Sequence, residues 1–364
     1  MNPWDWFLQF ERDAHARNDL DRERMARLYN EGRGFRESDP DRAYALFGEG
    51  RRQAERLEEP WWALFYAFWQ VEARLFFQRD YRDVLRPAVE AVLEVRKPRY
   101  AGFPFRFSIF YDLVSAYMGI DPLGYESELR QTLAGLEGEA AGVNNGGCLL
   151  ADRYAALAQT LGDWDGAESA VRRMMGHAES LPAGPGRQHF GVNGQSILCN
   201  IAFNRGDWER LAEHAAAGEA AARRIDYRML VAEFQLWQAY LAHRAGDAAA
   251  AARLRRLAVA QVGRLKKTPS GNWFKALCAW KLFDEDVAGA LRVCDREWKT
   301  IRGRGMLAYE CYCHVERCRL LARLGRPLEE ELAAARAAAG KLRAPAPRLA
   351  ELDRIQGGDV ATGS

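Results

Sequence analysis

β-Branched residues that favour strands are scarce in this sequence, which has only seven Ile and five Thr among 364 residues. The abundant residues are Ala, Leu, Arg and Glu, which favour helices, so the composition disfavours a sheet. Long apolar runs are also missing: no stretch of about 18 uncharged apolar residues occurs, and the most apolar segment, 61–77, contains Glu72 and Arg74. The sequence therefore predicts an all-α protein without a membrane span.

An excess of charge of one sign is absent as well. The chain has 52 Lys and Arg against 50 Asp and Glu, a formal net charge of +2, so it lacks the overall basic field typical of nucleic-acid binding. The seven cysteines follow no regular spacing, and residues 1–13 are charged and aromatic rather than a secretory leader. We expect a soluble cytoplasmic protein that binds neither nucleic acid nor membranes.

Common catalytic and cofactor motifs are also missing. The sequence has no P-loop, no G-x-G-x-x-G after a strand, no H-E-x-x-H, no G-x-S-x-G and no paired C-x-x-C. This absence disfavours an enzyme and gives no reason to expect a cofactor.

What the chain does have is an internal period of about 40 residues. Gly162-Asp163-Trp164 recurs as Gly206-Asp207-Trp208, and weaker Gly or Asp junctions complete a series at positions 38, 79, 119, 162, 206, 246, 285 and 325. Gly can adopt the left-handed conformation that ends one helix, and Asp can cap the next. This spacing predicts stacked helical hairpins that form a solenoid.

The junctions resemble the tetratricopeptide repeat (TPR). Leu161–Trp164 followed by Ala167 is similar to its turn, and Arg205–Trp208 repeats the pattern. The small residues that the motif needs seven positions before each junction are Ala155, Cys199, Ala239, Cys278 and Cys318. The likeness is clear over about 148–340. The sequence departs from the motif in two ways: the period exceeds the usual value of roughly 34 residues, and the Trp that normally opens the first helix is replaced. The longer period is similar to that of the degenerate repeats in bacterial regulatory proteins, including quorum-sensing peptide receptors.

The resemblance implies an all-α, right-handed superhelical solenoid of about eight antiparallel hairpins. We expect an N-terminal helical cap over 1–34, the TPR-like array over 35–340, and a Pro/Ala linker, short helix and flexible tail over 341–364. The aromatic-rich segment 61–77 is predicted to be buried core, with an exposed binding patch as the alternative.

The resemblance also implies that residues 13, 10, 6, 3 and 2 positions before each junction line a concave groove. The candidate groove residues at these offsets are Asn193, Asn200, Asn204, His243, Arg244, Asn272, Lys275, Arg319 and Arg323. Amides suit the backbone of an extended peptide, and cations suit an acidic group or a free C-terminal carboxylate. Alternatively, Asn193 caps a helix in a loop at 191–194, and the cations form a solvated face.

One cluster of residues has the side chains of a metal-binding site. On a helix, Cys311, His314 and Cys318 share a face, which would bring three soft ligands together. Core packing is the favoured interpretation, because Cys318 occupies the small buried position. The sequence thus predicts a non-catalytic scaffold or adaptor that binds a protein or peptide. A peptide-gated regulator of a separate partner is the alternative, and an enzyme or enzyme subunit is supported only by this cluster.

Overall fold

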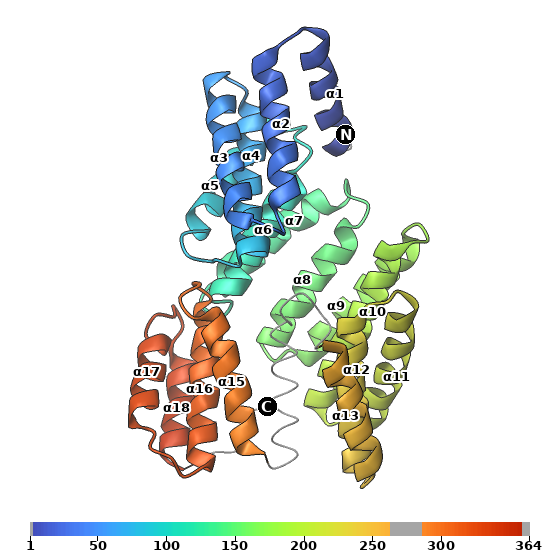
Figure 1. Cartoon of the computed structure of the whole chain (residues 1–364), viewed down its shortest axis with the longest axis vertical. Helices are drawn as coiled ribbons and strands as arrows, with labels where there is room; N and C mark the ends of the chain where they lie inside the picture. The colour runs from blue at the N-terminus through green and yellow to red at the C-terminus, as the bar shows by residue number, and fades with distance from the viewer. Residues whose placement is uncertain (1–2, 263–285, 359–364) are drawn as a thin grey trace. The chain divides into compact units, whose positions relative to one another are not determined.

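The computed structural model describes residues 3–262 and 286–358, and these residues form seventeen α-helices and no strand (Figure 1). The prediction of an all-α fold is confirmed. The chain divides into two compact units. Unit 1 comprises residues 1–143 and 303–306, and unit 2 comprises residues 144–302 and 307–364.

Unit 1 contains helices α1 to α7. Their bounds are α1 (Pro3–Ala16), α2 (Leu20–Phe35), α3 (Pro40–Arg56), α4 (Pro60–Glu72), α5 (Leu85–Val95), α6 (Arg106–Ile120) and α7 (Glu126–Ala140). A π-helical turn, η1 (Ala73–Gln78), continues α4, and a 3-10 turn, η2 (Pro98–Tyr100), precedes α6. Helices that follow one another in the chain pack together, such as α2 with α3 and α6 with α7. The boundary predicted after residue 34 falls in the last turn of α2, and the three-part division stays a prediction.

The core of unit 1 is aromatic. Trp62, Phe65, Tyr66 and Trp69 of α4 are buried, and Tyr29 of α2 packs against two of them, with ring centroids 4.9 Å from Phe65 and 5.2 Å from Trp69. Helix α4 can be apolar on nearly every side because α3, α5 and α6 all pack against it. The interpretation of 61–77 as core is confirmed for these residues, although Phe76 is 38% exposed.

Unit 2 contains the remaining helices. Their bounds are α8 (Gly146–Thr160), α9 (Trp164–Ser180), α10 (Pro185–Arg205), α11 (Trp208–Arg224), α12 (Arg228–Arg244), α13 (Ala248–Val262), α15 (Val287–Ile301), α16 (Leu307–Arg323), α17 (Glu329–Ala339) and α18 (Ala346–Gln356). The hairpins are α8/α9, α10/α11, α12/α13 and α16/α17, and α18 packs against both α16 and α17. The short helix predicted near the C-terminus is therefore present.

The hairpin turns of unit 2 have the predicted chemistry. Gly162 and Gly206 have φ values of +72° and +70°, in the left-handed region that ends a helix. The Asp163 carboxylate accepts a hydrogen bond from the backbone N–H of Gly166 at 2.9 Å, and Asp207 caps α11 in the same way. The junction predicted at 119 lies in the last turn of α6, and the one at 285 lies outside the described residues.

The small positions are packed as predicted. Ala155, Cys199, Ala239 and Cys318 are all 0% exposed, whereas Cys278 lies outside the described residues. A large side chain at any of the four would have to displace the facing helix.

The hypothesis that Asn193 caps a helix is wrong. Helix α10 begins at Pro185, which takes the first-turn position that proline favours, so Asn193 lies in the helix interior. The glycines that suggested a loop are tolerated within this helix. At Gly194 a Cβ atom would lie only 2.8 Å from the side chain of Met175 on α9, so glycine there allows two helices to pack closely.

Candidate functional site

The first helices of three successive hairpins, α8, α10 and α12, are joined by polar side chains. Asn200 Nδ2 of α10 donates a hydrogen bond to Gln159 Oε1 of α8 at 2.7 Å. One turn further along α10, Asn204 Nδ2 donates to the Asn200 carbonyl at 2.7 Å and lies 3.2 Å from Asn200 Oδ1. All three side chains belong to half-buried residues. We call Gln159, Asn200 and Asn204 the amide ladder.

A second bridge joins α10 to α12. The Ser196 hydroxyl donates a hydrogen bond to Glu233 Oε1 at 2.5 Å, and Glu233 is only 7% exposed. Burial raises the pKa of Glu233, an effect that the Ser196 hydroxyl partly offsets. This face therefore combines amides, a hydroxyl and a buried carboxyl group whose pKa is raised.

Four aromatic rings gather near the turns that follow α10 and α12. The ring centroid of Phe203 lies 5.0 Å from that of Trp237 and 5.2 Å from that of Tyr240, and Trp208 lies 5.6 Å from Tyr240. The guanidinium carbon of Arg244 is 4.0 Å from the centroid of the Trp208 ring. A guanidinium stacked in this way keeps its N–H edge available for a carboxylate.

The structure places the predicted groove residues in different environments. Asn193, Asn200 and Asn204 are half-buried on α10, and His243 and Arg244 are exposed at the end of α12. Asn272 and Lys275 lie outside the described residues. The structure thus brings Asn200 and Asn204 together, and it leaves the peptide-binding role of the whole set a prediction.

The two predicted cations of α16 differ from each other. Arg319 is 8% exposed and forms ion pairs with Glu316 of its own helix and Glu351 of α18. An anionic ligand would have to compete with these two carboxylates, which sequence spacing could not reveal because Glu351 lies on another helix. Arg323, by contrast, is exposed.

The possible metal ligands each have a structural role. Cys311 and Cys318 are fully buried in the core of α16, α17 and α18. His314 Nδ1 lies 2.6 Å from Glu331 Oε1, and its Nε2 accepts a hydrogen bond from Trp298 Nε1 at 3.2 Å. Across residues 3–262 and 286–358 no group of three or more His, Cys, Asp or Glu side chains is arranged to hold a metal ion.

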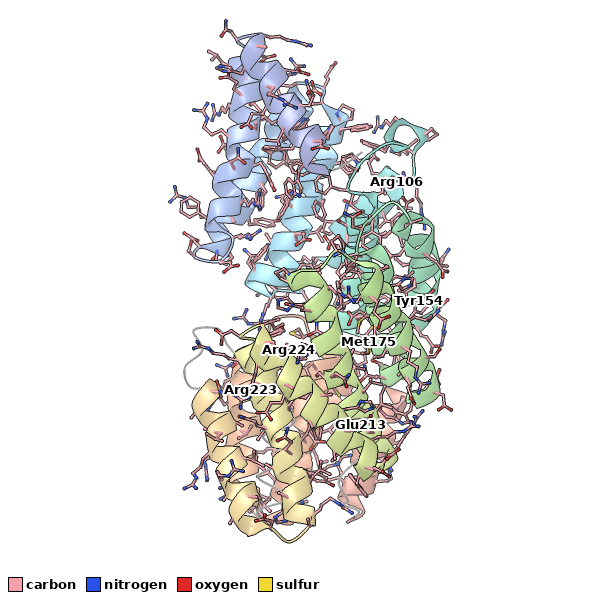
Figure 2. All side chains as sticks on the ribbon, turned by 90° about the vertical axis from the view of Figure 1, so that its right-hand side faces the viewer. Arg106, Tyr154, Met175, Glu213, Arg223 and Arg224 are labelled. Carbon is pink, nitrogen blue, oxygen red and sulfur yellow. The ribbon has the colours of Figure 1, made fainter. Side chains whose placement is uncertain are left out.

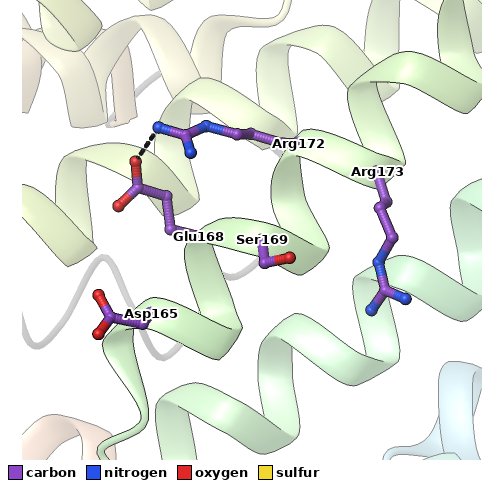
Figure 3. Close-up of a pocket in the computed structure, with 5 residues that line it drawn as sticks. All are labelled: Asp165, Glu168, Ser169, Arg172 and Arg173. Atoms are coloured by element: carbon purple, nitrogen blue, oxygen red, sulfur yellow. Dashed lines mark hydrogen bonds and ion pairs between the residues drawn. The ribbon is translucent and has the colours of Figure 1, made fainter.

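A charged hollow of about 480 Å³ lies along α9 (Figure 3). It is lined by Asp165, Glu168, Ser169, Arg172 and Arg173, all from this single helix. Glu168 forms ion pairs with Arg172, Arg205 and Arg210, so the charges there largely compensate one another. This hollow lacks the convergent groups from several elements that define a ligand site.

Helix α11, the second helix of its hairpin, carries solvent-exposed charge. On α11, Glu213, Arg223 and Arg224 are all exposed (Figure 2). The contacts through Gln159, Asn200 and Glu233 join first helices to one another, whereas the ion pair of Arg210 on α11 with Glu168 on α9 joins second helices.

Sequence reasoning missed three residues of this face. Gln159 stands 3 positions before the junction at 162, and Glu233 stands 13 positions before the junction at 246, so the same offsets select both. A rule that picks out asparagine and cations misses both, because one is a glutamine and the other a carboxylate. Trp237 occupies none of the offsets, and only the structure shows its contact with Phe203.

The antiparallel hairpins, the left-handed glycines and the small packed positions together define a TPR-like helical-repeat fold. No family model and no curated protein matches the chain. Among solved structures, the chain is similar to the apo form of the quorum sensor NprR from B. thuringiensis. That match has a TM-score of 0.54 and 14% identity, and it covers 88% of this chain and 86% of that chain.

A second solved structure, BtubC (BKLC) from P. vanneervenii, is less similar. The match has a TM-score of 0.33 and 17% identity over 77% of this chain and 92% of that chain, too loose a likeness to support an argument. The likeness to NprR supports the helical-repeat fold alone. None of the described helices has both the length and the apolar character needed to cross a bilayer.

Proposed function

We propose that this protein is a non-catalytic adaptor that binds an extended peptide, or an extended segment of a partner protein, along the first helices α8, α10 and α12. The observation that carries the proposal is the amide ladder of Gln159, Asn200 and Asn204, whose members hold one another in place across two hairpins. Asparagine is a poor helix former, so two of them on one face of α10 need a reason beyond helix stability.

The ladder suits a peptide backbone. An amide side chain both donates and accepts, and in the described part of the chain no donor reaches Asn204 Oδ1. Because the Asn200 and Asn204 side chains are already ordered by their mutual contact, a ligand would lose less conformational entropy in fixing them.

A carboxylate of the bound peptide, at its C-terminus or on an acidic side chain, would meet Arg244. This guanidinium is exposed and ordered by the Trp208 ring, whereas that of Arg319 is already paired with Glu316 and Glu351. Arg244 is therefore the better candidate of the two for recognising an anionic group.

A peptide-gated regulator is the second candidate, and one observation favours it. The fold resembles that of NprR, a quorum sensor, over 88% of this chain. In this version the bound peptide changes the arrangement of the hairpins and so controls a separate partner. For either role we propose a cytoplasmic protein that binds neither nucleic acid nor membranes.

The partner can be isolated on the tagged protein from native cell extract and identified by mass spectrometry. A synthetic peptide from the captured chain is then titrated against Asn204→Ala and Arg244→Ala. Each change should weaken binding roughly 2- to 12-fold, the loss of one hydrogen bond. Arg224→Ala is the matched control, because Arg224 is an exposed arginine on the second helix α11. Unchanged affinity in Asn204→Ala and Arg244→Ala would refute this binding face.

The same peptide separates scaffold from regulator. Hydrogen exchange of the full chain is compared with and without saturating peptide. Protection confined to α8, α10 and α12 indicates a scaffold, whereas changed exchange in helices that do not contact the peptide indicates a regulator.

A further inference from the structure

Unit 1 contains a carboxylate in an unusual position. Asp112, in the middle of α6, is 2% exposed, and neither of its carboxylate oxygens has a hydrogen-bond partner in the described residues. An ionised carboxylate without a partner in a protein interior is strongly unfavourable. Such a carboxyl group either keeps its proton and stays neutral, or its negative charge is balanced by a bound cation.

A second carboxylate lies close to it. Glu72 ends α4, which packs against α6 together with η1, and its charge acts on Asp112. Glu72 is half-buried, so solvent has access to the pair of carboxyl groups at Glu72. Two cations near the end of α2 also act on this region. The Arg36 guanidinium lies over the Phe77 ring, 5.7 Å from the centroid, and the Arg33 guanidinium lies over the Trp4 ring at 4.9 Å.

Two further buried polar groups are without partners. The Tyr29 hydroxyl and Trp69 Nε1 are buried and make no hydrogen bond among the described residues. Burial raises the pKa of Tyr29, the charges of Arg33 and Arg36 lower it, and the charge of Glu72 has a smaller effect that raises it. The rings of Tyr29 and Trp69 are packed together, with centroids 5.2 Å apart. Buried polar atoms are satisfied in nearly all native proteins, so the unpaired groups on α2, α4 and α6 can accept a bound ligand or water as their partner.

The residue types select the class of ligand. Among the described residues no group of three or more acidic, His or Cys side chains could hold a metal ion, so a Ca²⁺ ion, which takes about six to eight oxygen ligands, would find only two carboxylates here. A carboxylate pair that includes Glu72, one helical turn after Trp69 on α4, instead suits an organic cation.

We propose that Asp112 and Glu72 form a binding site for an alkylammonium group, the chemistry shared by polyamines and by the free N-terminus of a peptide. The site belongs to unit 1 and does not depend on the peptide-binding face proposed on α8, α10 and α12.

Binding at this site should release a proton. Burial, together with the other carboxylate in the case of Asp112, raises both pKa values, that of Glu72 to about 7, while Arg36 opposes the shift at Glu72. Near neutral pH the empty pair therefore retains a proton that an ammonium group displaces.

The test uses the full-length protein and isothermal titration calorimetry at pH 7. The probes are spermidine, the peptide Ala-Ala-Ala and its N-acetylated form, with NaCl and MgCl₂ at matched ionic strength. Spermidine, free Ala-Ala-Ala or both should bind, while the acetylated peptide should not. The apparent enthalpy should change with the ionisation enthalpy of the buffer, as proton release requires. The probe that binds identifies the source of the amine.

Variants locate the binding. Asp112→Asn and Glu72→Gln should each weaken it by at least about tenfold, and Glu90→Gln should not, because Glu90 is an exposed carboxylate of α5. If the Asp112→Asn variant does not fold, the affinity of the Glu72→Gln variant tests the proposal, because Glu72 is only half-buried. The proposal is overturned if neither amine binds wild type better than NaCl, if MgCl₂ alone binds, or if Glu72→Gln retains full affinity.

Discussion

Units 1 and 2 are both made of helical hairpins but differ in how the helices end and how the core is filled. In unit 2, glycines in the left-handed region end the first helices and small residues fill the closest contacts, as at Gly206 and Cys199. In unit 1, the positions of positive φ near helix ends are occupied by Asn18, Glu58 and Arg79, and the core consists of packed rings. The same architecture can therefore be specified by local turn chemistry or by tertiary packing.

The largest effect should come from the ring packing of unit 1. Gly50 of α3 lies against the Tyr66 ring, and a Cβ atom at Gly50 would overlap with that ring. Tyr66 cannot easily move, because it is fully buried and its hydroxyl donates a hydrogen bond to the Met25 carbonyl. We expect Gly50→Ala to lower the free energy of unfolding by about 3 kcal/mol, measured by urea denaturation.

Gly138→Ala is the matched control for this change. Gly138 also lies within a helix of unit 1, and no atom would come within 4 Å of a Cβ there. Alanine should stabilise α7 by up to about 1 kcal/mol. If the two variants unfold alike, the close packing of Tyr66 against α3 does not determine the stability of unit 1.

This contrast explains what the sequence could predict. The turns of unit 2 depend on neighbouring residues such as Gly206 and Asp207, so their period was visible and the hairpins were predicted. In unit 1 the partners of a ring lie on other helices, as for Tyr29 and Trp69, and no spacing rule records them. The likeness to the repeat motif was correspondingly weak before residue 148.

Prediction of the candidate site from the sequence is limited in the same way. The offsets found Asn200 and Asn204, because both lie at fixed distances from a junction. They could not show that Arg319 is neutralised, since that depends on how α18 packs back onto α16. Nor could they detect the buried Asp112, whose burial follows from the helices around α6.

The second effect is a pH dependence of unit 1. The pKa of Glu72 is raised to about 7 by burial, above its usual value of 4.5. Between these values the unfolded chain loses a proton that the folded protein keeps, so stability should fall as pH rises from about 5 to 7, by roughly 2 kcal/mol. Carboxylates with lowered pKa, such as Asp80 and Glu331, lose their stabilising effect only at lower pH.

Urea denaturation across pH 5 to 7.5 measures this dependence. Glu72→Gln should make the profile less steep, because an amide does not titrate, and Asp112 and Glu233, whose pKa values burial also raises, account for the slope that remains. A profile that keeps its slope in Glu72→Gln would assign the dependence to another group.

The smallest effects concern the turns. Gly206 has φ +70°, where a Cβ atom is unfavourable, so Gly206→Ala should destabilise unit 2 by about 1 kcal/mol. Its Cβ would meet only ordinary contacts, the nearest to Trp208 at 3.6 Å. The change therefore isolates backbone strain from packing.

Arg79 offers the reverse experiment in unit 1. It follows η1 with φ +50°, and as an exposed arginine it occupies a conformation that glycine adopts more easily. Arg79→Gly removes the strain of the left-handed residue but gives the unfolded chain more freedom, so the two effects partly cancel. We expect a gain of about 0.5 kcal/mol in the free energy of unfolding. A loss as large as that of Gly206→Ala would mean that the Arg79 side chain itself holds the turn, and that unit 1 does not rely on its aromatic core alone.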